Sequence, residues 1–207
     1  MFNPRYLLAA LFVAVAFAGG AWFFVAGLNG APASPRSATV FPAARPLPEF
    51  RLVDHRNQPF GRQSLEGHTS LLFFGFTHCP DICPATLQQL ALARRQLDGK
   101  EPALPEIVLI SVDPERDTPA VLERYVEYFG QGVTGVTGKL EDLRNLTTAL
   151  GIHFEQAPSG EGSADDYLVN HSAAVLVIDP QARLTAIFGA PHSVEAFVND
   201  LPLLMSR

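Results

Sequence analysis

Cys79 and Cys83 are the two cysteines of this 207-residue chain, and they lie close together in the segment THCPDIC. Three residues separate them, one more than in the usual redox Cys-x-x-Cys motif. The pair is predicted at the N-terminus of a helix over 84–97, where backbone N–H groups and the helix dipole stabilise a thiolate and lower the pKa of a thiol. The spacing is therefore compatible with disulfide exchange and with the binding of a soft metal ion. The weaker interpretation is a passive disulfide or two packed free thiols, and a disulfide that closes so short a loop removes little chain entropy.

A metal ion held by two thiolates needs at least one further donor, for which the chain offers six histidines. His78 adjoins Cys79, but we expect it to point across the strand end. His171 precedes an apolar strand predicted over 172–178, where a strand end near the sheet centre could face the cysteines. The residues alone favour a hydrogen-bonded histidine at that position, with a metal ligand as the alternative. His55, His68 and His192 are predicted as surface residues and His153 as a packed one.

The elements around the cysteines form the pattern of an α/β domain. Apolar runs of strand length alternate with helical patterns, and strand–helix–strand order implies parallel strands. A terminal hairpin and helix follow, so the order fits an α/β sandwich of the thioredoxin type. The predicted strands cover residues 50–53, 71–76, 107–112, 172–178 and 184–188, and the predicted helices 84–97, 118–129, 140–150 and 194–204.

The N-terminal part of the chain is predicted to cross a membrane. No ionisable side chain occurs from Leu7 to Leu28, and a helix of that length is roughly 33 Å long, against about 30 Å of bilayer hydrocarbon. A cleaved secretory signal fits less well because its apolar run is shorter. Prolines and small residues follow. We therefore expect a membrane anchor over 1–30, a proline-rich, poorly packed linker over 31–48 and one domain over 49–207.

The net charge of the chain limits the kinds of partner that it can bind. Lys and Arg number 15 and Asp and Glu 21, a net charge of −6, so the chain has no basic field for nucleic acid. All acidic residues lie in the domain that begins at Glu49. This acidity favours a basic partner surface or serves solubility alone.

Three motifs resemble the SCO/SenC family of membrane-anchored copper proteins and occur in the family's order. They are GFTHCPDICPATL from Gly75, SVDPERDTP from Ser111, and YLVNHS from Tyr167, which VLVIDP follows. The resemblance covers the chain from about Pro48 onward as well as the N-terminal anchor. It implies a thioredoxin-like fold with an N-terminal transmembrane helix, and copper, as Cu(I) or Cu(II), bound by Cys79, Cys83 and His171.

The role of the family implies that this chain is a copper metallochaperone, which delivers copper to the binuclear copper site of cytochrome c oxidase. The alternative is an enzyme, a thiol-disulfide reductase in which Cys79 and Cys83 are catalytic and keep the cysteines of that site reduced. The implied partners are the copper-site subunit of the oxidase, a periplasmic copper donor, a thiol reductant and the membrane. The implied location is the bacterial inner membrane, with a single pass and the domain facing the periplasm.

Two departures bear on these alternatives. The family commonly has Asp before the ligand histidine, whereas this chain has Asn170, which cannot neutralise a metal ion. No proline occurs from 164 to 179, where dithiol oxidoreductases of the thioredoxin class usually carry one, and this argues against general disulfide exchange.

The segment 113–119 matches a further signature of the family. Its local pattern predicts a loop followed by a capped helix start, and partner docking is the alternative interpretation.

Overall fold

The computed structural model describes residues 4–28, 34–101, 103–158 and 167–206. The chain divides into two compact units, Met1–Ser34 and Pro35–Arg207. Side chains are described for these residues except those at 4, 6–10, 23–28, 156–158 and 167–171.

The first unit contains one helix, α1 (Pro4–Leu28), of 25 residues. Its described side chains from Leu11 to Trp22 are exposed. Among the helices of the described residues, none combines the length and the apolar character needed to cross a membrane. The membrane span predicted over Leu7–Leu28 is therefore not confirmed by the structure.

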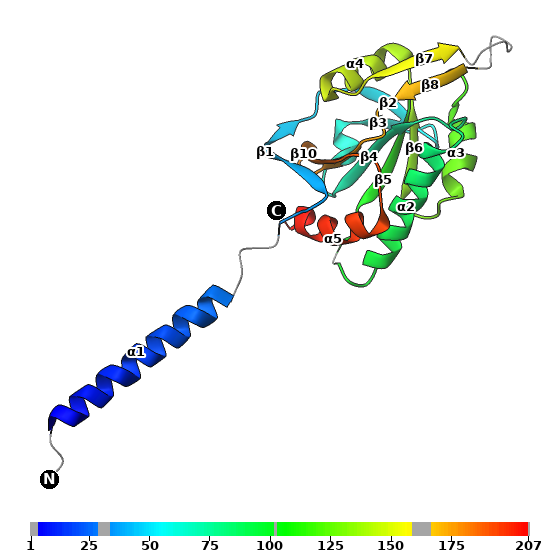
Figure 1. The fold of residues 1–207 in the computed structure, drawn as a ribbon. Helices are drawn as coiled ribbons and strands as arrows, with labels where there is room; N and C mark the ends of the chain where they lie inside the picture. The colour runs from blue at the N-terminus through cyan, green and yellow to red at the C-terminus, as the bar shows by residue number, and fades with distance from the viewer. Residues whose placement is uncertain (1–3, 29–33, 102, 159–166, 207) are drawn as a thin grey trace. The chain divides into compact units, whose positions relative to one another are not determined.

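The second unit is built on an eight-stranded sheet of order β1-β10-β9-β4-β5-β6-β2-β3 (Figure 1). The strands β4, β5 and β6 are parallel, as the strand–helix–strand pattern predicts, and the other pairs are antiparallel. Every residue of β4 is buried, which its continuous apolar run predicts for a central strand. The strands are β1 (Ala38–Pro46), β2 (Arg51–Asp54), β3 (Pro59–Gly61), β4 (Ser70–Gly75), β5 (Glu106–Ser111), β6 (Val133–Thr137), β9 (Val175–Ile178) and β10 (Arg183–Phe188).

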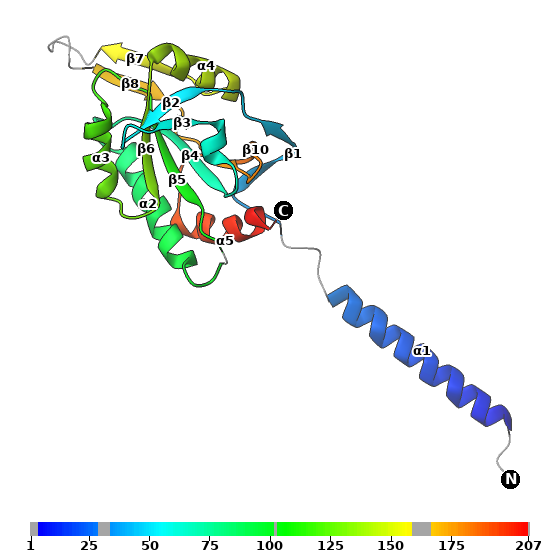
Figure 2. The same ribbon diagram turned by 180° about the vertical axis from the view of Figure 1, so that it is seen from behind.

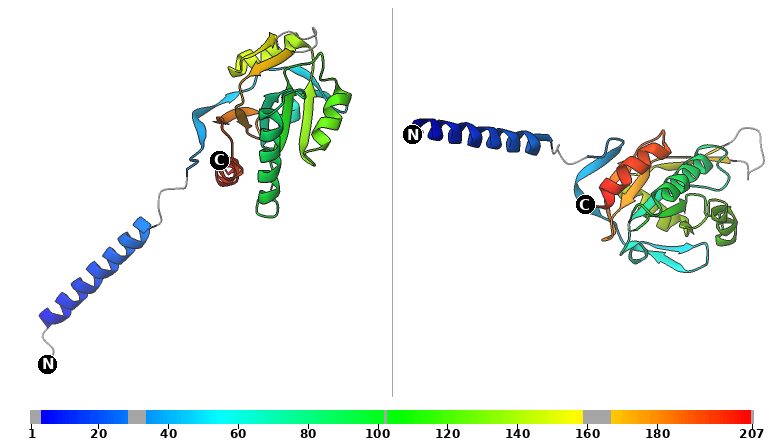
Figure 3. Two further views of the ribbon diagram at one scale, coloured as in Figure 1. Left: turned by 45° about the vertical axis from the view of Figure 1, so that its right-hand side comes forward. Right: turned by 90° about the horizontal axis from the view of Figure 1, so that it is seen from below.

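The helices of this unit pack against the sheet. Two of them, α2 and α5, lie side by side, and α3 packs on β6 (Figure 3). The α4 helix ends at Gly151, whose φ of 71° is the left-handed conformation that terminates helices. The helices are α2 (Ile82–Leu97), α3 (Pro119–Glu127), α4 (Leu140–Leu150) and α5 (Val194–Met205), with a 3-10 turn η1 (Arg62–Leu65).

A separate two-stranded sheet, β7 (Phe154–Pro158) and β8 (Tyr167–His171), lies beside α4 in both views (Figures 1 and 2). This hairpin corrects the prediction of one strand over 172–178. His171 ends β8, and β9 begins only at Val175. The prediction is confirmed for residues 175–178, which form β9, and is wrong for residues 172–174, which connect β8 to β9.

The linker predicted over 31–48 is also corrected, because residues 38–46 form β1 and pair with β10. Pro42 and Pro46 lack an N–H group, which a strand at the sheet edge tolerates, and the register shifts between Val40 and Arg45. The carboxylate of buried Asp200 accepts three successive backbone N–H groups, those of residues 36–38, at 2.7–3.0 Å. These contacts fix the start of β1.

Strand direction brings three segments to one edge of the sheet. The cysteines follow the C-terminal end of β4, and the segment 113–119 follows the C-terminal end of the parallel strand β5. Because β9 runs antiparallel to β4, with Val175 opposite Phe73, the beginning of β9 lies at the same edge. The chain therefore enters β9 from His171 close to the edge that carries the cysteines.

Candidate metal centre

The cysteine loop, residues 76–81, joins β4 to α2. The helix begins at Ile82, so Cys83 lies in its first turn and Cys79 precedes it. Both cysteines are thiols, and both are buried, with Cys79 8% and Cys83 0% exposed. The backbone N–H of Cys83 donates to Sγ of Cys79 at 3.3 Å. This bond holds the first sulfur at the helix N-terminus beside the second cysteine.

The pKa of the Cys83 thiol is raised well above its ordinary value. The hydrogen bond with the Cys79 side chain is the main cause, followed by burial, while a backbone hydrogen bond with Phe76 acts in the opposite direction. The expectation that the helix N-terminus lowers the pKa of both thiols is thus wrong for Cys83, because burial and the neighbouring sulfur outweigh the helix dipole. A metal ion that binds Cys83 must displace its proton.

Asp117 braces the cysteine loop from the neighbouring segment. Its fully buried carboxylate accepts the backbone N–H of Thr77 at 3.0 Å, the hydroxyl of Thr77 at 2.5 Å and the hydroxyl of Ser111 at 2.6 Å. Burial raises the pKa of Asp117, and these hydrogen bonds partly oppose that rise. Sequence reasoning missed this residue, although its position just after a strand parallel to β4 was a usable signal.

The rest of the segment 113–119 supports the same loop. Buried Asp113 forms an ion pair with Arg116, whose guanidinium lies 5.9 Å from the ring centroid of Phe76. The Thr118 side chain caps α3 through the N–H of Val121. These contacts give the segment a structural role beneath the cysteine loop.

The described histidines differ from their predicted environments in three cases. His55 is buried, and its Nδ1 accepts the N–H of Gly135 at 3.2 Å, so it is not a surface residue. His153 is exposed and not packed. His192 is half-buried and bonded to the carbonyl of Ala173. For His55 and His192 the difference arises because the contacts of the ring come from residues distant in sequence.

Two histidines, His78 and His171, are candidates for the third metal ligand. His78, with 55% of its side chain exposed, has Nδ1 3.1 Å from the Thr77 hydroxyl and 4.0 Å from the Asp117 carboxylate. The backbone of His171 pairs with Phe154 in the β7–β8 hairpin, but its imidazole lies outside the described side chains. Within the described part of the chain, no three His, Cys, Asp or Glu side chains gather into a metal-binding cluster.

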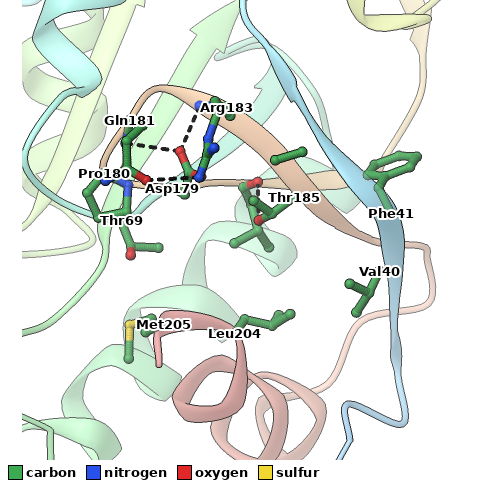
Figure 4. Close-up of a pocket in the computed structure, with 12 residues that line it drawn as sticks. Val40, Phe41, Thr69, Asp179, Pro180, Gln181, Arg183, Thr185, Leu204 and Met205 are labelled. Atoms are coloured by element: carbon green, nitrogen blue, oxygen red, sulfur yellow. Dashed lines mark hydrogen bonds and ion pairs between the residues drawn. The ribbon is translucent and has the colours of Figure 1, made fainter. Parts of the chain in front are cut away.

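A cavity of about 280 Å³ lies away from the cysteines, between β1, the β9–β10 turn and the end of α5 (Figure 4). Phe41 and Leu204 provide apolar walls, and Arg183 borders it while paired to Asp179 at 2.6 Å. Neither cysteine lines this cavity. It is therefore separate from the candidate metal centre.

Residues 41–206 match the family model described as SCO1/SenC. The chain belongs to the SCO1/SenC family. This SCO1/SenC chain is 39% identical over 168 residues to a protein of Stutzerimonas stutzeri, with 81% of each chain covered. It is 37% identical over 155 residues to the mitochondrial SCO2 homolog of Mus musculus, covering 74% of this chain and 60% of the mouse protein.

Solved structures agree with this SCO1/SenC assignment. Arabidopsis thaliana ScoI with copper bound has a TM-score of 0.69 and 32% identity, covering 73% of this chain and 92% of that one. Yeast Sco1 with copper bound has a TM-score of 0.70 and 30% identity, covering 77% and 87%. The thioredoxin-like α/β fold predicted from the sequence is therefore confirmed for the SCO1/SenC domain.

Proposed function

We propose that this protein is a copper metallochaperone in which Cys79, Cys83 and His171 hold one copper ion. The observation that carries the proposal is the pairing of two buried thiols at the start of α2, with the N–H of Cys83 on Sγ of Cys79. Thiolates are soft ligands that suit Cu(I). The relatives solved with copper bound support copper as the metal.

His171 is the proposed third ligand. Support comes from the antiparallel pairing of β9 with β4, which brings the chain that follows His171 to the sheet edge carrying the cysteines. Neutral imidazole binds both copper oxidation states, and Cu(II) would need an additional oxygen or water donor. Asn170 precedes the histidine and adds no charge, so two thiolates carry the whole negative charge of the proposed ligand set.

Delivery would proceed by ligand exchange. Incoming thiolates of the acceptor would displace Cys79 and Cys83 one at a time, and copper would keep its oxidation state throughout. The raised pKa of Cys83 favours return of a proton to that sulfur when it leaves the metal, which assists release. The nearly buried Cys79, 8% exposed, is the sulfur that an acceptor reaches first.

We propose that the recipient is the copper-site subunit of cytochrome c oxidase and that the uncharged segment Leu7–Leu28 holds the domain at the bacterial inner membrane, facing the periplasm. A second protein would donate copper there. Because the periplasm is oxidising, a thiol reductant would be needed to prevent a disulfide between Cys79 and Cys83, which cannot bind copper.

The competing function is a thiol-disulfide reductase. The N–H donated to Sγ of Cys79 favours this residue as the attacking thiolate. Cys79 would form a mixed disulfide with the target, and Cys83 would resolve it, so that the target gains two electrons and this protein forms a disulfide. The raised pKa of Cys83 slows the resolving step, because only the thiolate is nucleophilic.

A competition titration of the reduced full chain with Cu(I) and a chromophoric chelator separates the two functions. The wild type should bind one copper ion, and Cys79→Ser, Cys83→Ser and His171→Ala should each lose more than about 100-fold in affinity, since removal of a ligand costs more than removal of its supporting contacts. His78→Ala is the matched control and should bind normally. Unchanged affinity in His171→Ala would refute the ligand assignment. Copper-free turnover of a disulfide substrate that is insensitive to His171→Ala would favour the reductase.

A further inference from the structure

His192 links the protein core to the chain that follows His171. Its Nε2 lies 2.6 Å from the carbonyl oxygen of Ala173. A carbonyl can only accept a hydrogen bond, so Nε2 carries the proton and donates it. The imidazole also stacks on Phe197, with 5.5 Å between ring centroids. Phe197 is fully buried and makes an edge contact with Phe188 at 4.8 Å, so one side of the His192 ring is fixed by the core.

The partner of His192 belongs to the connector of residues 172–174, which joins β8 to β9. The N–H of Ser172 donates to the carbonyl of His153 at 3.3 Å, and the N–H of Ala174 donates to the hydroxyl of Ser172 at 3.4 Å. The first of these bonds reaches the residue just before β7, and the second stays within the connector. The bond from His192 is different because it ties the connector to the loop that leads into α5.

The β7–β8 hairpin depends on such ties for its orientation. It forms a sheet of its own and shares no strand pairing with the eight-stranded sheet, and a two-stranded hairpin is marginally stable by itself. Ala173 is two residues from His171, a distance of at most about 7 Å along an extended chain. Fixing Ala173 therefore restricts where the end of β8 can lie.

We propose that His192 is a positioning residue for copper binding, which orients the strand that carries His171 through the Nε2–H bond to Ala173. This inference rests on the proposed role of His171 as a ligand. A ligand held in place before the metal arrives loses less conformational freedom on binding, which raises affinity. Without the bond, the two thiolates still bind copper, but the imidazole must be ordered as it joins them.

Two substitutions separate the hydrogen bond from the packing of the ring. His192→Phe keeps an aromatic ring against Phe197 and removes the N–H donor. His192→Gln places an amide N–H near the position of Nε2 and restores the donor without the ring. Urea unfolding of each full-length variant shows whether it is folded, and a competition titration with Cu(I) gives its affinity.

The decisive measurement is a double-mutant cycle with His171→Ala. We expect His192→Phe to weaken Cu(I) binding about tenfold, the size of effect seen when contacts supporting a metal ligand are removed, and His192→Gln to recover most of that loss. In the His171→Ala background, His192→Phe should change affinity less than about twofold, because effects that act through one residue are not additive.

Three other results would contradict either the positioning role of His192 or the ligand role of His171. An equal loss from His192→Phe in both backgrounds would show a general structural effect and overturn the positioning role. Wild-type affinity in His192→Phe would overturn it as well. Unchanged affinity in His171→Ala alone would instead refute the ligand assignment of the proposed function, and the positioning role would fail with it.

Discussion

Thr77 donates both its backbone N–H and its hydroxyl to the carboxylate of Asp117, at 3.0 and 2.5 Å, although the two residues lie 40 positions apart in the chain. The contact is made because β4 and β5 are parallel neighbours, so that the loops following them lie together. The cysteine loop is thus held in place by the next loop of the sheet. A substitution of Asp117 should therefore disturb the metal centre although it changes neither cysteine.

We predict that Asp117→Ala destabilises the domain and weakens Cu(I) binding. The change leaves the two donors of Thr77 and the hydroxyl of Ser111 without their acceptor, and a buried unsatisfied donor costs about 1–3 kcal/mol. The free energy of unfolding in urea should fall by about 2–4 kcal/mol. Exposed Glu115, changed to Ala, is the control and should stay within about 0.5 kcal/mol of the wild type. Equal stability of the two variants would show that Asp117 does not brace the loop.

The raised pKa of Asp117 predicts a specific pH dependence. Because burial raises the folded-state pKa above the ordinary 3.8, the folded chain binds this proton more tightly than the unfolded chain does. The contribution of Asp117 to stability is therefore complete below 3.8 and declines as the pH rises through the raised value. Asp117→Asn does not titrate. Urea unfolding at a series of pH values should show the wild type losing stability relative to this variant as the pH rises, and a relative gain would mean that the hydrogen bonds outweigh burial.

Gly75 is predicted to be required for the packing of Cys83. A Cβ atom at this position would lie 3.0 Å from Sγ of Cys83 and 3.2 Å from Cδ1 of Leu109, closer than ordinary contacts. Overpacking a core typically costs about 1–3 kcal/mol, so Gly75→Ala should lower the free energy of unfolding by that amount and weaken Cu(I) binding by displacing the sulfur. Gly189 has nothing within 4 Å of the same built atom. Gly189→Ala should therefore bind copper normally, and a Gly75→Ala variant that matched it would disprove the steric argument.

The sequence predicted the elements whose signals are local. The buried run of β4 and the helix with Pro84 in its first turn were recognisable because burial on both faces and helix initiation leave compositional traces. The parallel arrangement followed from the order of strands and helices. These elements place the cysteines, so the position of the thiol pair was accessible from the sequence alone.

What the sequence did not predict depends on distant partners. The proline content of β1 indicated a spacer, because nothing local reveals that an edge position and a partner, β10, are available. His55 looked like a surface residue, yet its bond to Gly135 spans 80 positions. The direction of the pKa shift of Cys83 was missed for a different reason, because its main cause is the hydrogen bond with the neighbouring Cys79 side chain. Burial, the second cause, depends on the whole packed domain and not on the helix that begins beside it.

Tyr125 presents a buried hydroxyl for which the described part of the chain supplies no hydrogen-bond partner. Burial raises its pKa, and charge on Cys83 and Cys79 raises it further, so the phenol stays neutral. An unsatisfied buried polar group costs about 1–3 kcal/mol. Tyr125→Phe removes only the hydroxyl and should leave the free energy of unfolding unchanged or raise it by about 1 kcal/mol. Tyr128, 82% exposed on the same helix end, provides the control Tyr128→Phe, which should change little. A clear loss of stability in Tyr125→Phe alone, measured by urea unfolding of the reduced copper-free protein, would show that the hydroxyl is bonded in solution.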